Sequence, residues 1–138
     1  MSCEYTVLRA AGNLPQSTQS PIFTVSGGRV LLTALIPEVT TTIQNQANSS
    51  SVYVNPTVGG DVLVWSVGNI QANDVGMMLG VDLSGSATTA FAVVPFPLHP
   101  LVVPAGTIDL SCPVSNTGQL KWLLKYVPLD AGATVTAA

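Results

Sequence analysis

Few residues of this chain could carry out chemistry, and they lie far apart in the sequence. The 138 residues include one histidine, His99, and two cysteines, Cys3 and Cys112. No serine stands in the Gly-x-Ser-x-Gly turn that presents a nucleophile in many hydrolases, so the sequence shows no catalytic partner for His99. One histidine and two distant thiols also cannot supply the three or four ligands of a zinc site. We expect two free thiols, with Cys112 in the core.

The acidic residues form no recognisable site either. Five aspartates stand singly, each near a predicted turn: Asp61, Asp74, Asp82, Asp109 and Asp130. The Asp-x-Asp spacing of a calcium-binding loop is absent. Glycosidase carboxylate pairs are set by geometry in space, and no spacing in this chain points to one. We therefore expect no catalytic residues, no metal site and no cofactor.

The chain carries few charges. Lys, Arg, Asp and Glu make up 8% of the residues, against about 25% in an average soluble domain. The basic residues Arg9, Arg29, Lys121 and Lys125 are too few for a nucleic-acid or membrane-surface footprint. No apolar run approaches the roughly 20 residues that span a bilayer, and the start of the chain lacks the basic and apolar regions of a signal peptide. We expect no nucleic-acid or membrane partner, and folding in the cytoplasm.

The pattern of turns and apolar runs is that of an all-β protein. Residues 22–25 and 29–36 suit strands, and Gly27-Gly28 between them predicts a hairpin turn. In residues 120–126 the alternation directs Leu120, Trp122, Leu124 and Tyr126 into a core, and Lys121, Leu123 and Lys125 outward. About eight to ten short strands separated by turns predict one antiparallel β-sandwich or jelly-roll domain, residues 22–138.

Two segments are expected at the margin of this domain. Residues 1–21 are predicted to form an extended N-terminal arm, because Pro15 and Pro21 flank a polar connector and disfavour helix. Residues 95–104 contain four prolines and predict an edge strand or a surface ribbon, since proline has no N–H for a sheet.

The shortage of charge suggests that other copies of the chain cover much of the subunit surface. A monomer with so few charges would have little to prevent association, and obligate interfaces are apolar and bury about 2,000 Å² or more. The candidate contact residues come from the arm, the proline-rich segment and the outward side of the last long strand: Tyr5, Val7, Leu8, Pro97, Leu98, Leu101, Val103 and Leu123.

Four stretches resemble small structural proteins of tailed bacteriophages. They are IFTVSGGRVLLT (22–33), EVTTTIQ (38–44), AGTIDL (105–110) and KWLLKYVPLDAGA (121–133), which together extend over most of the chain after residue 21. The resemblance implies a head decoration, or cement, protein that is β-rich, often trimeric, and bound outside the head across neighbouring capsomers. Its partners would be its own copies and the major capsid protein. It would be made in the host cytoplasm, lie on the capsid surface of the virion, and carry no catalytic residues.

Other functions stay open. One is another virion component, such as a head-fibre base, a tail protein or a baseplate protein. A second is a carbohydrate-binding β-sandwich, which would present exposed aromatic rings, whereas Trp65, Trp122 and Tyr53 are predicted to point mostly inward. A third is a hydrolase built on the sandwich, which the single histidine disfavours. We expect a structural protein and not an enzyme.

Overall fold

Antiparallel strands make up the ordered elements of the computed structural model, which describes residues 3–78, 80–81, 87–88 and 101–138. The described residues contain no helix, and thus none that could cross a membrane. The strands are β1 (Tyr5–Asn13), β2 (Thr18–Ser26), β3 (Val30–Thr41), β4 (Ser49–Pro56), β5 (Val62–Asn69), β6 (Gly80–Val81), β7 (Ala87–Thr88), β8 (Leu101–Val103), β9 (Gly106–Cys112), β10 (Gln119–Pro128) and β11 (Thr134–Ala137).

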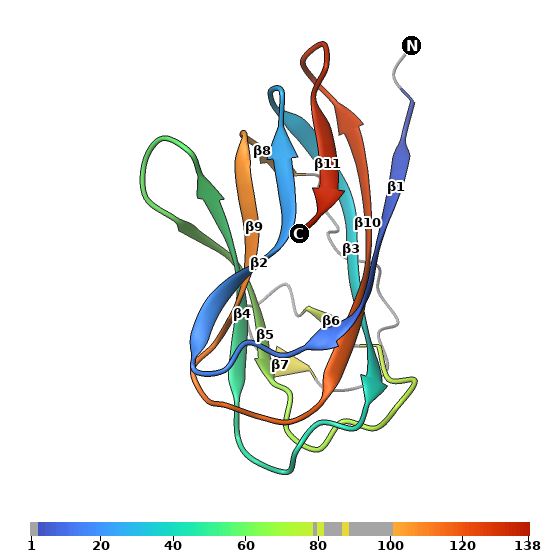
Figure 1. The fold of residues 1–138 in the computed structure, drawn as a ribbon, viewed down its shortest axis with the longest axis vertical. Coiled ribbons are helices and arrows are strands. Elements are labelled where there is room, and N and C mark those ends of the chain that lie inside the picture. The colour runs from blue at the N-terminus through green and yellow to red at the C-terminus, as the bar shows by residue number, and fades with distance from the viewer. Residues whose placement is uncertain (1–2, 79, 82–86, 89–100) are drawn as a thin grey trace.

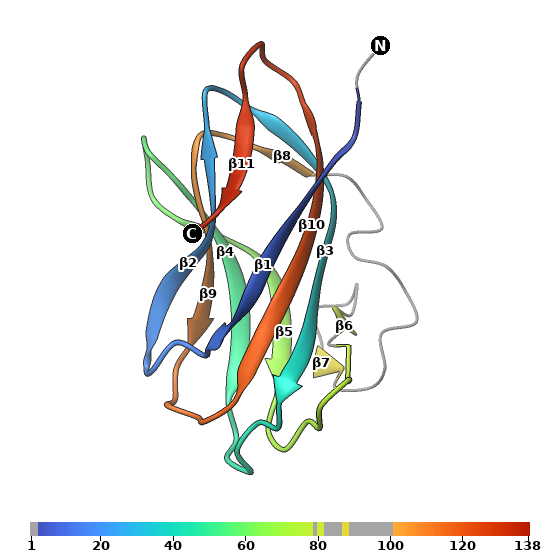
Figure 2. The same ribbon diagram turned by 45° about the vertical axis from the view of Figure 1, so that its right-hand side comes forward.

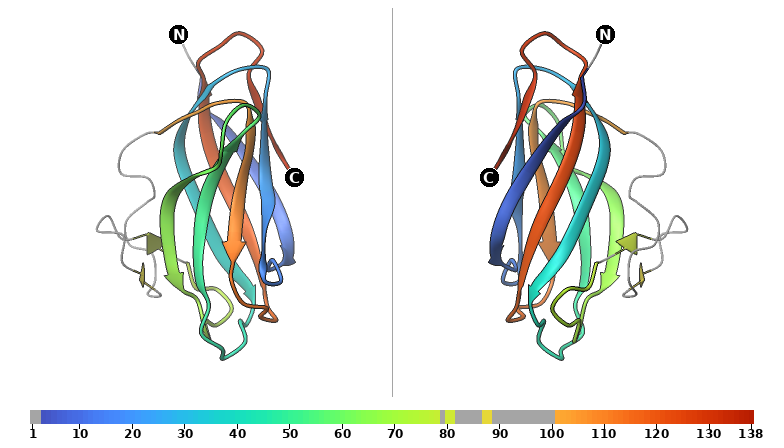
Figure 3. Two further views of the ribbon diagram at one scale, coloured as in Figure 1. Left: turned by 90° about the vertical axis from the view of Figure 1, so that its left-hand side faces the viewer. Right: turned by 90° about the vertical axis from the view of Figure 1, so that its right-hand side faces the viewer.

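Two sheets face each other as the layers of a sandwich (Figures 1 and 3). The first sheet has the strand order β1-β10-β3-β8, and the second has the order β11-β2-β9-β4-β5. A small ribbon, β6-β7, lies beside β5 at one edge of the sandwich (Figure 2). The predicted all-β antiparallel sandwich is confirmed.

The strands pair as if one long antiparallel hairpin, with its tip between β4 and β5, had been folded over into two sheets. β4 pairs with β5, β3 with β8, β2 with β9, and β1 with β10, so the partners move outward in step along the chain. Successive pairs alternate between the two sheets, and β10-β3 and β9-β4 complete them. This nesting of two four-stranded sheets is the jelly-roll arrangement, with β11 added beside β2.

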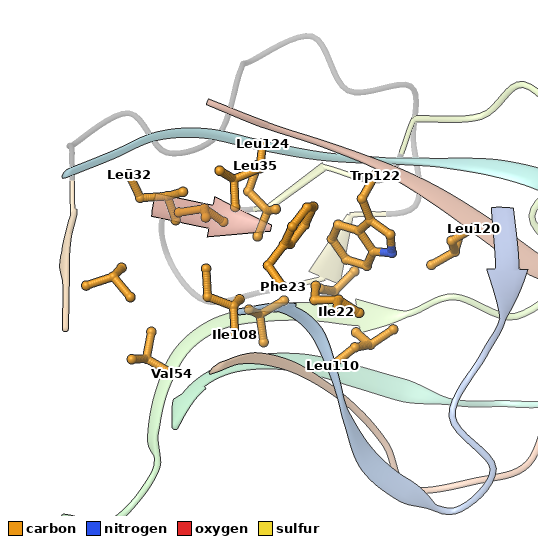
Figure 4. Close-up of a cluster of buried hydrophobic side chains, with 14 of the residues drawn as sticks. Ile22, Phe23, Leu32, Leu35, Val54, Ile108, Leu110, Leu120, Trp122 and Leu124 are labelled. Carbon is orange, nitrogen blue, oxygen red and sulfur yellow. The ribbon is translucent and has the colours of Figure 1, made fainter. Parts of the chain in front are cut away.

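The core forms where the inward side chains of the two sheets meet (Figure 4). Phe23 of β2 lies between the layers and is fully buried, with Leu35 of β3 and Leu124 of β10 opposite it. The predicted alternation of the last long strand is confirmed, because its even positions are buried and Lys121 is exposed. Ile108, Leu110 and Cys112 of β9 also face inward.

The predicted N-terminal arm is largely part of the sandwich, which corrects its expected boundary at residue 21. Residues 5–13 form β1, which pairs with β10, and residues 18–26 form β2. Val7 packs against the core, which gives β1 an inward side. Pro21 is tolerated in β2 because the strand register shifts there and β11 pairs only from Phe23 onward.

The predicted hairpin at Gly27-Gly28 is wrong, since β2 and β3 belong to different sheets. The two glycines carry the chain across the sandwich beneath the turn between β10 and β11. Gly28 has a φ of 141°, and a Cβ placed on it would lie 2.6 Å from the Cβ of Asp130. Asp130 accepts hydrogen bonds from the backbone N–H and the guanidinium of Arg29, at 2.8–3.0 Å. The glycines therefore allow a close approach that the Arg29–Asp130 pair then fixes.

The end of the proline-rich segment forms an edge strand, as predicted. Residues 101–103 are β8, which pairs with β3 at the edge of the first sheet. Pro97 and Leu98, two of the predicted contact residues, lie outside the described residues.

Replacing the central core aromatic tests the packing between the sheets. We expect Phe23→Ala to lower the free energy of unfolding by about 3–5 kcal/mol, because it leaves a cavity between the layers. Val58→Ala is the matched control, since Val58 is 88% exposed and its truncation should change stability by about 0.5 kcal/mol or less. Urea unfolding followed by tryptophan fluorescence measures both, and equal effects would contradict this account of the core.

We expect the Arg29–Asp130 pair to make the stability of the fold decrease at acidic pH. Hydrogen bonds from the Arg29 side chain and backbone lower the pKa of Asp130 from 3.8 to about 2. The unfolded chain therefore binds a proton more readily, so the stability from this carboxylate is complete above its unfolded pKa and is lost as pH falls toward about 2. Urea unfolding between pH 5 and pH 2 should show a shallower loss of stability for Asp130→Asn, and Arg29→Gln should reproduce it. An unchanged pH profile in both variants would refute the assignment.

Candidate functional site

The outer side of the first sheet carries two rows of apolar side chains. Leu8 of β1, Leu123 of β10 and Ile36 of β3 stand directly opposite one another across three strands. Farther along, Val127 of β10, Leu31 of β3 and Val102 of β8 form a second row. The four residues on β3 and β10 alternate with buried core residues, and Leu8 and Val102 pair directly with them across the sheet, so all six point away from the core. We term the six residues the apolar face: Leu8, Leu31, Ile36, Val102, Leu123 and Val127.

This apolar face is partly exposed to solvent, which is unusual for the outer side of a sheet. Leu8 is 70% exposed and Val102 is 51% exposed, while the other four are half-buried by their neighbours. An antiparallel sheet that faces water normally presents polar side chains on that side. Strand spacing and rise give the sheet a projected area of roughly 600 Å², close to the about 800 Å² that each partner contributes to a standard interface.

The few charges of this sheet lie between and beside the apolar rows. Lys125 stands between them, opposite Thr6 of β1. Lys121 pairs with Glu38 at 3.5 Å beyond the Leu123 row. Glu4 reaches across β10 and accepts a hydrogen bond from the Thr33 hydroxyl at 2.6 Å. Among the described residues Lys125 takes part in no ion pair, so one positive charge on this face has no partner within the described part of the chain.

The outer side of the second sheet is mostly polar. Asp109 of β9 lies at its centre and accepts hydrogen bonds from Thr107 at 2.6 Å and from Gln19 at 2.9 Å, with Asn55 at 3.4 Å. The Gln19 amide also donates to Asp61 at 3.0 Å. Although Asp109 is only 3% exposed, its carboxylate is well supplied with donors. The network explains how a buried acid is accommodated.

Tyr53 is placed on this polar side, which corrects the prediction that it points inward. It lies between the buried Val52 and Val54 of β4 and directly opposite Asp109 of β9. It is half-buried, and the exposed Leu63 of β5 stands beside it. Trp122 is buried as predicted, and the side chain of Trp65 lies outside what the structure describes.

The predicted contact residues divide between the surface and the core. Leu8 and Leu123 belong to the apolar face. Tyr5 is half exposed at the start of β1, where its ring stacks on Tyr126 with a centroid distance of 5.5 Å. Val7 and Leu101 are partly buried against the core. Val103 is fully buried, which removes it from the candidates, because its side chain faces inward on β8 opposite Val30.

Four residues of the apolar face were missed by sequence reasoning. Leu31, Ile36, Val102 and Val127 alternate with core residues, so the period-two pattern of each strand held part of the signal. Their assembly into rows depends on which strands pair and in which register.

The side chains that could act in catalysis or bind a metal do not cluster in the described part of the chain. Cys3 is exposed and Cys112 is buried, and both are free. Burial raises the pKa of the Cys112 thiol, while hydrogen bonding to Ser50 and Asn48 partly opposes this. His99 lies outside the described residues. The described residues hold no group of three or more His, Cys, Asp or Glu side chains suited to a metal ion.

A cavity of about 260 Å³ opens beneath the second half of β1. Arg9, Gly12 and Asn13 border it on the strand side, while Leu110 and Trp122 border it on the core side. The Arg9 side chain donates a hydrogen bond to the carbonyl oxygen of Ala138 at 3.3 Å. The cavity shows that the middle of β1 is incompletely packed against the sandwich.

Comparisons with protein-family models, with curated proteins and with solved structures found no match to this chain.

Proposed function

We propose that this protein is a structural component of a virus particle, a decoration protein that binds the outside of a tailed-phage head. It would act as an oligomer of its own copies, with a trimer favoured, and stabilise the shell across neighbouring capsid subunits. The major capsid protein is its proposed second partner, and it would perform no reaction.

The observation that carries this proposal is the apolar face. A chain with few charges covers the second sheet largely with hydroxyl, amide and carboxyl groups, apart from the exposed Val62 and Leu63 of its edge strand β5, and leaves the first sheet with two apolar rows. Contiguous exposed apolar surface marks interaction sites on soluble proteins. We assign the outer side of the first sheet, with the apolar face on it, to the contact between copies of the chain, because the projected area of that whole sheet approaches the area of one side of a standard interface.

The jelly-roll arrangement is compatible with this role. Viral capsid domains use it, and so do lectins and cupins, so it allows several functions and selects none. The sequence stretches that resemble phage structural proteins lie on framework strands and turns, including β2, β3, β9 and β10. The resemblance to phage structural proteins supports the same proposal, and it involves strands of both sheets.

A decoration protein stabilises a shell by mass action. A ligand that binds the assembled lattice, and not its separated subunits, adds its binding free energy to the stability of the lattice. An oligomer binds through several copies at once, which raises the effective concentration of each remaining contact. Modest apolar contacts in each subunit are then sufficient for firm attachment, and no catalytic group is required.

Charged substitutions on the apolar face test the proposal. We expect the wild-type chain to be an oligomer by light scattering, and Leu8→Asp with Leu123→Asp to shift it to the 14.2 kDa monomer, because burying unpaired carboxylates is unfavourable. The same variant should lose at least tenfold in affinity for undecorated heads of the parent phage, measured by co-sedimentation.

The matched control is Val58→Asp, which adds a charge at an apolar residue of the loop between β4 and β5, away from this face. It should retain the wild-type mass and head binding. A wild-type chain that is monomeric at micromolar concentration and does not bind heads would refute the proposal. Circular dichroism confirms that each variant is folded.

The position of Tyr53 favours one second candidate, carbohydrate binding on the outer side of the second sheet. The half-buried ring of Tyr53 stands opposite Asp109, whose carboxylate Asn55 and Gln19 contact, so an apolar surface lies near polar groups that could bind hydroxyls. If this candidate holds, the chain should bind specific saccharides on a glycan array, and Tyr53→Ala should abolish the binding. Tyr5→Ala, which alters the half-exposed tyrosine of β1, is the control. No binding by the wild-type chain would eliminate this candidate.

A further inference from the structure

The first strand contributes no fully buried side chain to its own subunit. None of the nine residues of β1 is buried, and within the described residues β1 pairs with β10 alone, at the edge of its sheet. Two of its side chains contact the core: Val7 packs against it, and the ring of Tyr5 stacks on the core residue Tyr126. By contrast, five residues of β9 and four residues of β10 are buried.

The pairing of β1 is interrupted and its packing is incomplete. The register with β10 shifts between Arg9 and Gly12, which divides the ladder into two parts. The cavity of about 260 Å³ lies next to this interruption. Separating β1 from β10 would uncover Val7 and the ring of Tyr126 stacked on Tyr5, and would open further the cavity that Leu110 and Trp122 border.

The link from β1 to β2 is short and locally strained. It consists of residues 14–17, with Leu14 buried as an anchor and Pro15 next to it. Ser17 has a φ of 52°, which is the left-handed region that residues other than glycine rarely adopt. Opening the link to an extended path would relieve this conformation. Short strained links of this kind favour exchange of the adjoining element between copies.

We propose that β1 is exchanged between copies of this chain, so that β1 of one subunit pairs with β10 of a neighbour and completes its four-stranded sheet. The inference rests on the proposed oligomer and names the element that joins its subunits. The exchanged strand makes the same contacts that it makes within one subunit, including Tyr5 on Tyr126, so no new recognition chemistry is needed.

Exchange also ties the subunits together through the apolar face. Leu8 would come from one subunit, while Leu123 and Ile36 would come from its neighbour, so the first apolar row would be built from two chains. A four-residue link spans at most about 14 Å when extended. The donor and acceptor subunits must therefore meet at the edge of the sheet that β1 occupies.

A disulfide across the β1–β10 pair distinguishes exchange from closure within one subunit. Thr6 and Lys125 stand directly opposite each other, so the variant carries Thr6→Cys and Lys125→Cys with Cys3→Ser, and retains the buried Cys112. After oxidation of the oligomer, non-reducing denaturing electrophoresis should show covalent species of at least twice the 14.2 kDa chain mass. Leu8→Cys with Leu123→Cys repeats the measurement at the next outward pair if the first variant does not fold.

Two controls calibrate the result. Lys121→Cys with Glu38→Cys joins β10 to β3, which exchange of β1 does not separate, and should give only the monomer band. Inserting four Gly/Ser residues after Gln16 should move the β1–β10 cross-link from the covalent oligomer to the monomer band, because a longer link allows closure within one chain.

Each outcome decides the question. An oligomer by light scattering that yields only monomers after cross-linking would overturn exchange and leave the proposed oligomer intact. A wild-type chain that is monomeric by light scattering would overturn both. Covalent oligomers from the β1–β10 pair, with monomers from the β10–β3 pair, would support exchange.

Discussion

The two-residue period of its strands, imposed by one shared core, is the constraint on which the rest of this structure depends. Phe23, Leu35 and Leu124 must meet between the layers, so their neighbours along each strand must point outward. The core determines which positions of each strand point outward, but it does not determine whether the residues at those positions are polar or apolar. The outer side of the second sheet holds a buried carboxylate with its donors, whereas the first sheet holds two apolar rows. That asymmetry is independent of the core, and the proposed contact between copies of the chain depends on it.

Because the chain carries few charges, little electrostatic repulsion opposes association through the apolar face. The described residues contain two ion pairs, and apart from the pH-dependent contribution expected of Asp130, side chains this open to solvent add little to stability. Burial between the sheets therefore provides most of the folding free energy, and the surface has few charges to oppose association. An apolar sheet face on such a surface is energetically suited to a partner that also presents apolar groups. A second copy of the same chain meets that requirement without any further specificity.

The edge strand β1 of the first sheet is the element through which folding would be linked to the proposed assembly. A jelly roll joins its outermost strand to the sandwich by one ladder only, and here that ladder is interrupted near a cavity. The strand therefore contributes little to the core, although it supplies Leu8 to the apolar face. An element of this kind can serve two subunits at small cost, because its contacts are the same in either arrangement.

Local pattern was sufficient to predict strands β9 and β10 and their inward residues, because side-chain alternation depends only on neighbours along the strand, but it did not show that residues 5–13 pair with β10 as strand β1. The sequence also determined the low charge and the absence of recognisable catalytic spacing. Only the tertiary structure decided that Gly27-Gly28 crosses between sheets, since a glycine pair permits both a hairpin and a crossing. Tyr53 was misplaced although its flanking valines held the correct signal, and Val103 proved to be core. The rows of the apolar face arise from pairing between strands that are distant in sequence, and long-range pairing is set by the packing of the whole sandwich.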